Sequence, residues 1–305
     1  MIELLASRGD GKLEKIPVTV IGAAAQEAMM KVTHGRVAGV TSRGAFLRAD
    51  DRVLFLTAVD YHSPFNLTLE SVDHLFSALQ PGDKFDVTEN GILFSGRGFR
   101  LLTRGAEVWR PVHPAHLVFS LKEQRGRADL LIAEIKRIDD EKGFLFLSKP
   151  LDEVMPDHQR NLHQAAGRLT QSFRTGEKDS FMSAARKLLG VGSGLTPSGD
   201  DFLTGFFMYH FRYLQTGASE PEYLQDWWAE LTRLAFEKTT TISANRLEYA
   251  ARGWSEELFL KLIDHLFNPE VDFGADQVQR LVDFGHSSGV DTLMGISFGL
   301  DSLLD

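Results

Sequence analysis

The pattern of apolar residues changes at Pro111-Val112-His113-Pro114, and this change constrains the fold more than any other feature of the sequence. Each proline removes a backbone donor and disfavours helix in the preceding residue, so the segment predicts a break. Before it, short segments rich in β-formers alternate with Gly, Asn and Asp; after it, apolar residues recur at helical spacing. The sequence therefore predicts an α+β protein, with a mostly antiparallel, barrel-like β domain over 1–115 and a mainly α-helical domain over 116–305.

The β assignment depends on residues 36–109. An apolar run at 53–59 follows a polar turn, and residues 85–87 face residues 92–94 across Asn90-Gly91. Asn-Gly is a strong hairpin signal because both residues accept positive φ. We therefore expect paired strands on either side of Asn90.

The helical assignment depends on spacings of three and four residues. Helices are indicated near residues 130–138, 162–173, 224–235 and 258–266. The pair Trp227-Trp228 falls on one of these apolar faces, where tryptophan is more often part of a core than a stacking platform.

Composition excludes several classes of function. The formal net charge is −9 and no dense Lys/Arg run occurs, so neither a nucleic acid nor an anionic membrane is expected as the main partner. With no cysteine there is no disulfide and no thiolate nucleophile. The first ten residues lack the apolar core of a signal peptide, and no run of about 18 apolar residues occurs. We expect a cytoplasmic protein.

Two polar turns share one pattern. Residues 198–205 and 288–295 both read Ser-Gly-x-Asp-x-Leu-x-Gly, and each leads into an apolar helical stretch. The spacing predicts that Ser198 and Ser288 are N-caps, with Asp201 and Asp291 completing capping boxes. Ordinary capping explains such turns if nothing else is present, because an aspartate also complements the helix dipole.

The turns carry more small polar groups than capping needs, which favours one shared site for a small anion such as phosphate or carboxylate. A Thr/Ser block at 239–243 places hydroxyls on one helix face as a third wall, unless they bond back to their own helix. The candidate anion-binding residues are Ser193, Gly194, Thr196, Ser198, Gly199, Thr239, Thr240, Ser243, Ser287, Ser288, Gly289 and Asp291.

Three blocks together resemble the AllH family. They are Gly-x-Gly-Leu-Thr-Pro-Ser-x-Asp-Asp from Gly192, Thr-Thr-x-x-Ser-x-x-x-Leu from Thr239, and Gly-His-Ser-Ser-Gly-x-Asp-Thr-Leu-x-Gly from Gly285. The resemblance covers roughly residues 179–304. The β-rich part before them is much less diagnostic of the family. It implies a subunit of oxamate carbamoyltransferase that acts with protein partners in allantoin catabolism, a branch of purine degradation. The implied reaction exchanges a carbamoyl group between oxalurate and phosphate, giving oxamate and carbamoyl phosphate.

Carbamoyl transfer needs positioning and charge stabilisation, and the candidate catalytic residues are Asp200, Asp201, Arg246 and His286. Arg246 is expected to clamp a substrate carboxylate, or else to be a surface arginine. Asp200 or Asp201 is expected to act as a base or to orient the attacking nitrogen.

A carboxylate beside a bound anion is repelled, which leaves two arrangements open. Either the aspartates face away as caps, or a cation such as Mg²⁺ bridges them and the anion. We predict no cofactor and no protein metal site, since the histidines lack zinc-ligand spacing. Two alternatives to a transferase subunit stay open: a non-catalytic metabolite-binding or assembly subunit, and a metal-dependent hydrolase that uses Asp200 and Asp201.

Overall fold

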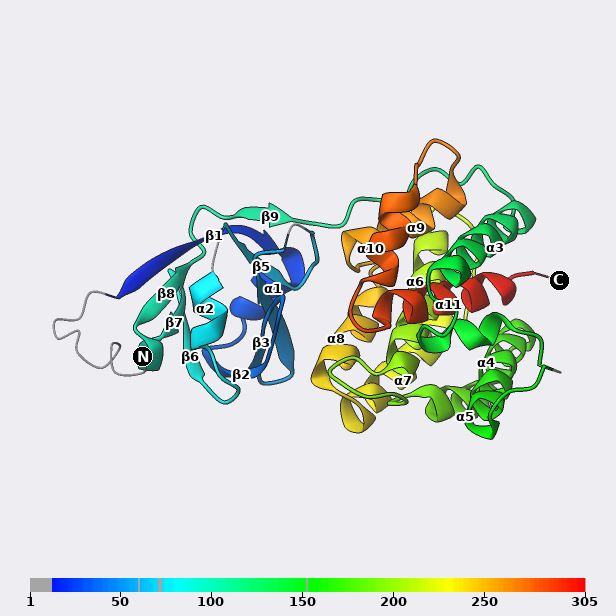
Figure 1. Cartoon of the computed structure of the whole chain (residues 1–305), viewed down its shortest axis with the longest axis horizontal. Coiled ribbons are helices and arrows are strands. Elements are labelled where there is room, and N and C mark those ends of the chain that lie inside the picture. Colours follow the sequence, from blue (N-terminus) through cyan, green and yellow to red (C-terminus); the bar gives the residue numbers. More distant parts are fainter. Residues whose placement is uncertain (1–12, 60, 71–72, 152, 305) are drawn as a thin grey trace. The chain divides into compact units, whose positions relative to one another are not determined.

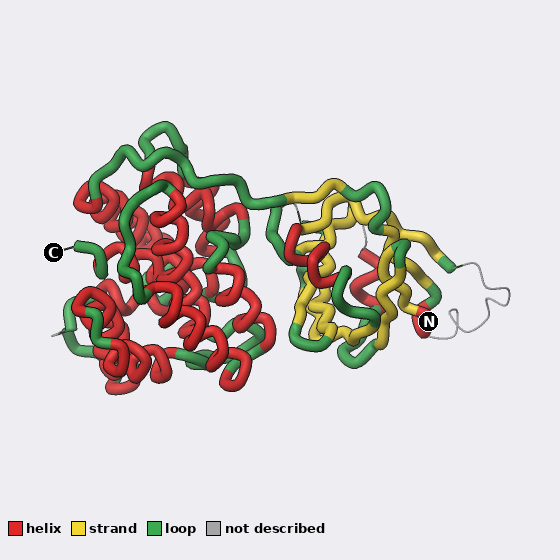
Figure 2. The backbone as a smooth tube through the Cα atoms, turned by 180° about the vertical axis from the view of Figure 1, so that it is seen from behind, coloured by secondary structure: helices red, strands yellow, loops and turns green. Residues whose placement is uncertain are grey.

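The computed structural model describes residues 13–59, 61–70, 73–151 and 153–304. The chain divides into two compact units, Met1–Arg110 and Pro111–Asp305. Strands dominate the first unit and helices the second (Figure 2). The predicted fold class, a barrel-like β part followed by a helical part, is confirmed.

The first unit is a closed eight-stranded barrel with an extra strand (Figure 1). Its strands are β1 (Glu14–Gly22), β2 (His34–Thr41), β3 (Gly44–Ala49), β4 (Arg52–Thr57), β5 (Asn66–Leu69), β6 (Lys84–Thr88), β7 (Gly91–Phe94), β8 (Phe99–Leu102) and β9 (Glu107–Trp109). Two short helices, α1 (Ala23–Met29) and α2 (Asp73–Ala78), and the 3₁₀ turn η2 (Ser95–Arg97) complete the unit. The strand order is β5-β4-β3-β2-β6-β7-β8-β1, and the β1–β5 pairing closes the barrel while β9 adds to β1.

Alternation along the strands fills the barrel. Leu47, Leu54, Leu56, Ile92 and Leu101 are all fully buried within one cluster. Since side chains on a strand point alternately to the two faces, these residues line the interior while their neighbours face outward.

The predicted hairpin at Asn90-Gly91 is confirmed. Asp86 pairs with Leu93 and Val87 with Ile92, in antiparallel register. Gly91 has a φ of +128°, and a Cβ there would lie 1.9 Å from the carbonyl oxygen of Leu101. Both the backbone conformation and the close neighbouring strand therefore require glycine.

The second unit is built from helices. They are α3 (Leu121–Ile138), α4 (Asp157–Thr175), α5 (Lys178–Leu188), α6 (Ser198–Gln215), α7 (Leu224–Lys238), α8 (Thr241–Ala250), α9 (Glu257–Phe267), α10 (Ala275–Val282) and α11 (Ser288–Asp301), with a 3₁₀ segment η3 (Gly143–Ser148). Trp227 is 3% exposed on α7, as predicted for a core residue, whereas Trp228 is only partly buried and its Nε1 donates to the carbonyl of Leu247.

Helices α6 and α11 form the centre of this unit. Every residue of α6 from Gly199 to Arg212 is buried, as expected for a helix that is surrounded by others. The helices cross at glycines: a Cβ on Gly205 would lie 2.2 Å from the carbonyl oxygen of Thr292, and one on Gly295 would lie 1.9 Å from that of Phe202. In the two copies of the repeat, Gly205 corresponds to Gly295 and Phe202 to Thr292. The crossing therefore brings both predicted turns to the same end of the helix pair.

In the described ranges, no helix combines the length and the apolar character that a membrane span requires.

Candidate functional site

The two turns repeat in structure as well as in sequence. In the first, the N–H of Gly199 donates to the carbonyl of Val191 at 2.9 Å; in the second, the N–H of Gly289 donates to that of Phe284 at 3.1 Å. A Cβ on either glycine would meet a backbone carbonyl oxygen of the preceding helix within 2 Å. Gly199 and Gly289 therefore allow tight packing, and their N–H groups are already used within the protein.

The predicted capping boxes are wrong. The N-cap of α6 is Pro197 and that of α11 is Ser287, and neither helix has a side-chain cap hydrogen bond. Ser198 and Ser288 are the first residues inside their helices, one position too late to cap.

The hydroxyls instead join the two turns. Thr196 Oγ1 lies 3.0 Å from Ser288 Oγ, and Ser198 Oγ lies 3.3 Å from Ser287 Oγ. The predicted meeting of the two turns is therefore seen as direct contact between their side chains.

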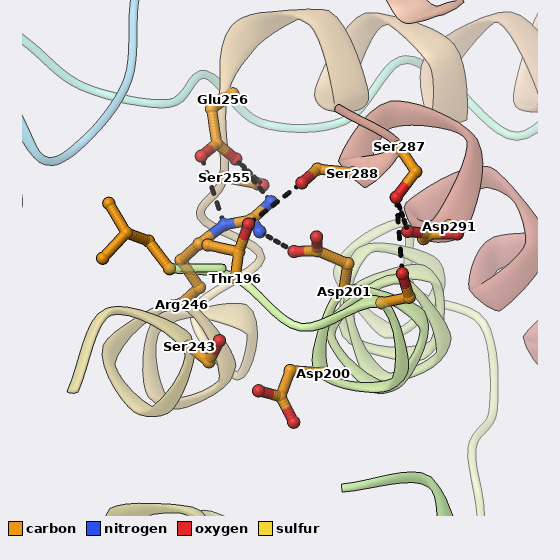
Figure 3. Close-up of polar contacts among 12 residues, drawn as sticks. Thr196, Asp200, Asp201, Ser243, Arg246, Ser255, Glu256, Ser287, Ser288 and Asp291 are labelled. Carbon is orange, nitrogen blue, oxygen red and sulfur yellow. Dashed lines mark hydrogen bonds and ion pairs between the residues drawn. The ribbon is translucent and has the colours of Figure 1, made fainter. Parts of the chain in front are cut away.

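A buried cluster of Asp201, Arg246 and Glu256 lies beside this contact (Figure 3). Arg246 comes from α8, and its Nη1 pairs with Oδ1 of Asp201 on α6. Its Nε lies 3.3 Å from Oε1 of Glu256, whose other oxygen accepts a hydrogen bond from Ser255 at 2.7 Å. Arg246 is 6% exposed, so it is not a surface arginine, and both ends of its guanidinium face protein carboxylates.

The electrostatics of this cluster favour a proton acceptor near neutral pH. Burial raises the pKa of Asp201 to about 7, against the lowering effects of Arg246 and of the nearby Ser288 hydroxyl. Burial lowers the pKa of Arg246, but Glu256 and Asp201 outweigh it and hold that pKa above its usual value. Arg246 thus remains a cation, while Asp201 is available in both protonation states around pH 7.

Asp200 points away from the guanidinium of Arg246 (Figure 3). Its Oδ1 accepts a hydrogen bond from the N–H of Gly190 at 2.7 Å, and its Oδ2 accepts one from Thr239. Burial raises its pKa, and the hydrogen bonds from Thr239, Gly190 and Ser243 oppose that shift. These contacts fix the start of the first turn.

The Thr/Ser block lies against the first turn but does not form one helix face. Thr239 ends α7 in extended conformation, and Thr240 caps α8 by accepting a hydrogen bond from the N–H of Ser243 at 3.1 Å. The Thr240 hydroxyl then donates to the carbonyl of Leu195 at 2.7 Å. The chain leaves helical conformation between α7 and α8. The Thr240 side chain accepts the hydrogen bond that a backbone carbonyl would accept in a continuous helix.

Asp291, the counterpart of Asp201, has different partners. Its Oδ1 accepts a hydrogen bond from the N–H of Phe144 in η3 at 2.7 Å, and its Oδ2 accepts one from Ser287 at 2.7 Å. Burial raises its pKa, against the effect of Ser287 and Phe144. Both of its oxygens are therefore occupied by the protein.

Three candidates lie at the surface: Ser193, Gly194 and His286 are exposed. Three contributors were not predicted, namely Ser255, Glu256 and Phe144. Ser255-Glu256 directly precedes α9 and resembles an ordinary helix start, while Phe144 contributes only a backbone N–H. Neither feature carries a signal in the sequence.

Among the residues that the structure describes, no group of three or more His, Asp or Glu side chains is arranged to hold a metal ion.

Replacing Asp201 with asparagine should change how stability depends on pH. Because the folded state raises the pKa of Asp201 from 3.8 to about 7, it binds this proton more tightly than the unfolded chain does. The stability of the native protein, relative to Asp201→Asn, should therefore fall between about pH 4 and 7, by up to roughly 1.4 kcal/mol per pH unit, and level off above pH 7. Urea unfolding of both proteins at pH 5 and pH 8 measures this difference; a difference independent of pH contradicts it.

The comparisons with known proteins point to the same segment. A family model described as oxamate carbamoyltransferase subunit AllH matches residues 188–300. The resemblance predicted from the three blocks is thus confirmed, and the family's description as a subunit implies a multi-subunit enzyme. No solved structure matches the chain.

Proposed function

We propose that this chain is a subunit of a carbamoyltransferase that acts on oxamate and carbamoyl phosphate in oxalurate breakdown, and that the reacting groups meet beside Asp201. The observation that carries the proposal is the coincidence of the family match with the site. The matched residues 188–300 include both turns, α8 and Glu256, whereas the whole barrel lies outside them.

The reaction explains why a proton acceptor is needed. The amide nitrogen of oxamate attacks the carbonyl carbon of carbamoyl phosphate; a C–N bond forms and the C–O bond to phosphate breaks, giving oxalurate and inorganic phosphate. An amide nitrogen is a weak nucleophile until its proton begins to leave, so a general base with a pKa near the working pH is required.

Asp201 fits this role, because its pKa is about 7 and Arg246 orients its carboxylate. Serine and threonine hydroxyls from both turns lie next to it, where they stabilise negative charge developing on the carbonyl oxygen. In the reverse direction, protonated Asp201 returns the proton to the leaving nitrogen.

A second function is favoured by one specific observation. The N–H groups of Gly199 and Gly289 bind protein carbonyls, and both ends of Arg246 face carboxylates, so these anion-binding groups are already occupied. That arrangement suits a metabolite-binding or assembly subunit whose partner performs the chemistry.

Substitution of Asp201 in the assembled complex separates the two functions. With Asp201→Asn, phosphate release from carbamoyl phosphate and oxamate should fall in kcat by about 100-fold or more, because general bases contribute roughly 10²–10⁴. The matched control is Asp283→Asn, an exposed aspartate close to the second turn, which should keep full activity. Unchanged activity of Asp201→Asn would support the assembly function, and activity that persists in a metal chelator would contradict a metal-dependent hydrolase.

A further inference from the structure

Carboxyl groups outnumber cations in the buried part of the site. Asp201 and Glu256 share one guanidinium, that of Arg246, while Asp200 and Asp291 are held by backbone N–H and hydroxyl groups; each of the five residues is at most 7% exposed. A phosphate or carboxylate brought into this set would meet surplus negative charge at low dielectric. A group that carries N–H donors would be attracted instead.

Three of the four carboxyl groups already accept hydrogen bonds from the protein at both oxygens or pair with Arg246. Asp200 and Asp291 each receive a backbone N–H and a hydroxyl, and Glu256 is bound by Ser255 and Arg246.

Asp201 differs from these three carboxyls. Its Oδ1 pairs with Arg246, but its Oδ2, in a residue 1% exposed, has no hydrogen-bond partner among the described residues. The Ser288 hydroxyl lies close enough to lower the pKa of Asp201, but it makes its hydrogen bond of regular geometry with Thr196, at 3.0 Å.

The repeat makes this difference informative. Asp201 and Asp291 occupy the same position in the two copies, ahead of the same helix crossing. In the second copy both oxygens are bonded by η3 and Ser287, which makes Asp291 a structural residue. In the first copy one buried oxygen is left unpaired, and a buried unpaired acceptor is costly unless something fills it.

We propose that Asp201 Oδ2 binds the H₂N–C(=O) group that oxamate and carbamoyl phosphate share, and that this subunit does not bind their anionic ends at the buried cluster. The inference rests on the proposed function for the identity of the ligands. An amide N–H donates to Oδ2, and the adjoining carbonyl oxygen accepts from the Thr196 or Ser288 hydroxyl. The same contact places the nitrogen's proton on the atom that accepts it during transfer.

We place the approach of the amide to Asp201 between the two turns. Thr196, Ser198 and Ser287 are only half-buried, and the turns are joined there by two hydroxyl–hydroxyl contacts of 3.0 and 3.3 Å. A planar amide takes the place of the Thr196–Ser288 contact, because its carbonyl oxygen accepts from one of these hydroxyls while its N–H donates to Asp201.

Oxamate and oxalate form a matched pair of probes, because they differ only in an NH₂ group that is replaced by a charged oxygen. Calorimetric titration of the assembled complex at pH 8 should show oxamate binding about tenfold or more tightly than oxalate, as expected for one charge-assisted hydrogen bond gained and one repulsion avoided. Asp201→Asn should bring this ratio close to one, since the asparagine amide donates to oxalate. Asp283→Asn should keep the ratio of the native protein, and thermal unfolding checks that both variants are folded.

Acetamide and acetate provide a second pair that does not depend on the carbamoyltransferase substrates. Equal or tighter binding of oxalate, a ratio unchanged by Asp201→Asn, or no binding of either pair would overturn the inference. A retained preference for amides in a complex that transfers no carbamoyl group would overturn the proposed function and leave amide recognition standing. Carbamoyl transfer by a complex that shows no preference for amides would overturn the inference and leave the proposed function standing.

Discussion

Replacing Arg246 with methionine should destabilise the protein by about 3–5 kcal/mol and abolish carbamoyl transfer. Methionine keeps an unbranched, flexible side chain but is shorter and carries no charge, and it suits the apolar surroundings of Phe259, whose ring centroid lies 5.8 Å from the guanidinium carbon. It leaves Asp201 and Glu256 facing each other without a cation, and the loss of one partner from a buried ion pair costs about 3–5 kcal/mol. Urea unfolding at pH 8, above the pKa of about 7 of Asp201, gives the free energy of unfolding.

A matched control and a rescue sharpen this test. Arg280→Met makes the same chemical change at an exposed position on α10 and should alter stability by less than about 0.5 kcal/mol. Adding Glu256→Gln and Asp201→Asn to Arg246→Met removes the unpaired charges, so the triple variant should regain part of the lost stability. A loss below about 1 kcal/mol for Arg246→Met would mean that the two carboxyl groups are hydrated or protonated in the variant and do not need the cation.

Local signals in residues 36–109 predicted a barrel-like β domain, but they missed the strand that closes it, β1 (Glu14–Gly22). Asn90-Gly91 identified the β6–β7 hairpin because turn chemistry and register both depend on neighbouring residues. The closing strand β1 pairs in parallel with β8 and antiparallel with β5. Pairings between such distant segments depend on burial in three dimensions and leave no mark at either position.

The sequence also predicted only part of the site. The repeated pattern at Ser198 and Ser288 predicted that two turns meet, which the hydroxyl contacts confirm. Their capping boxes were wrong, since cap position shifts by one residue without any change in the pattern. Glu256 was missed because a carboxylate before a helix has an ordinary local explanation, and its role depends on where Arg246 from another helix lies.

Substituting Gly295 with alanine should destabilise the helical unit by about 3 kcal/mol and lower carbamoyl transfer. The new Cβ would lie 1.9 Å from the carbonyl oxygen of Phe202 and 2.9 Å from the N of Phe206, and backbone atoms cannot turn aside as a side chain does. The helices must therefore separate, and overpacking of this kind costs about 1–3 kcal/mol or more. Asp201 and Asp291 lie one turn before the two crossing glycines, so the same movement also widens the site. Unfolding in urea and the phosphate-release assay measure the two effects.

Gly167→Ala on α4 provides the matched control with the opposite sign. A Cβ at Gly167 meets no atom within 4 Å beyond the neighbouring backbone of its own helix, and the residue is exposed. Alanine there should stabilise the protein by about 0.5–1 kcal/mol, because it lowers the entropy of the unfolded chain and favours helix. If Gly295→Ala were also neutral or stabilising, the close crossing of α6 and α11 would not be what holds the two turns together, and the site's geometry would have to depend on the hydroxyl contacts and on Arg246 alone.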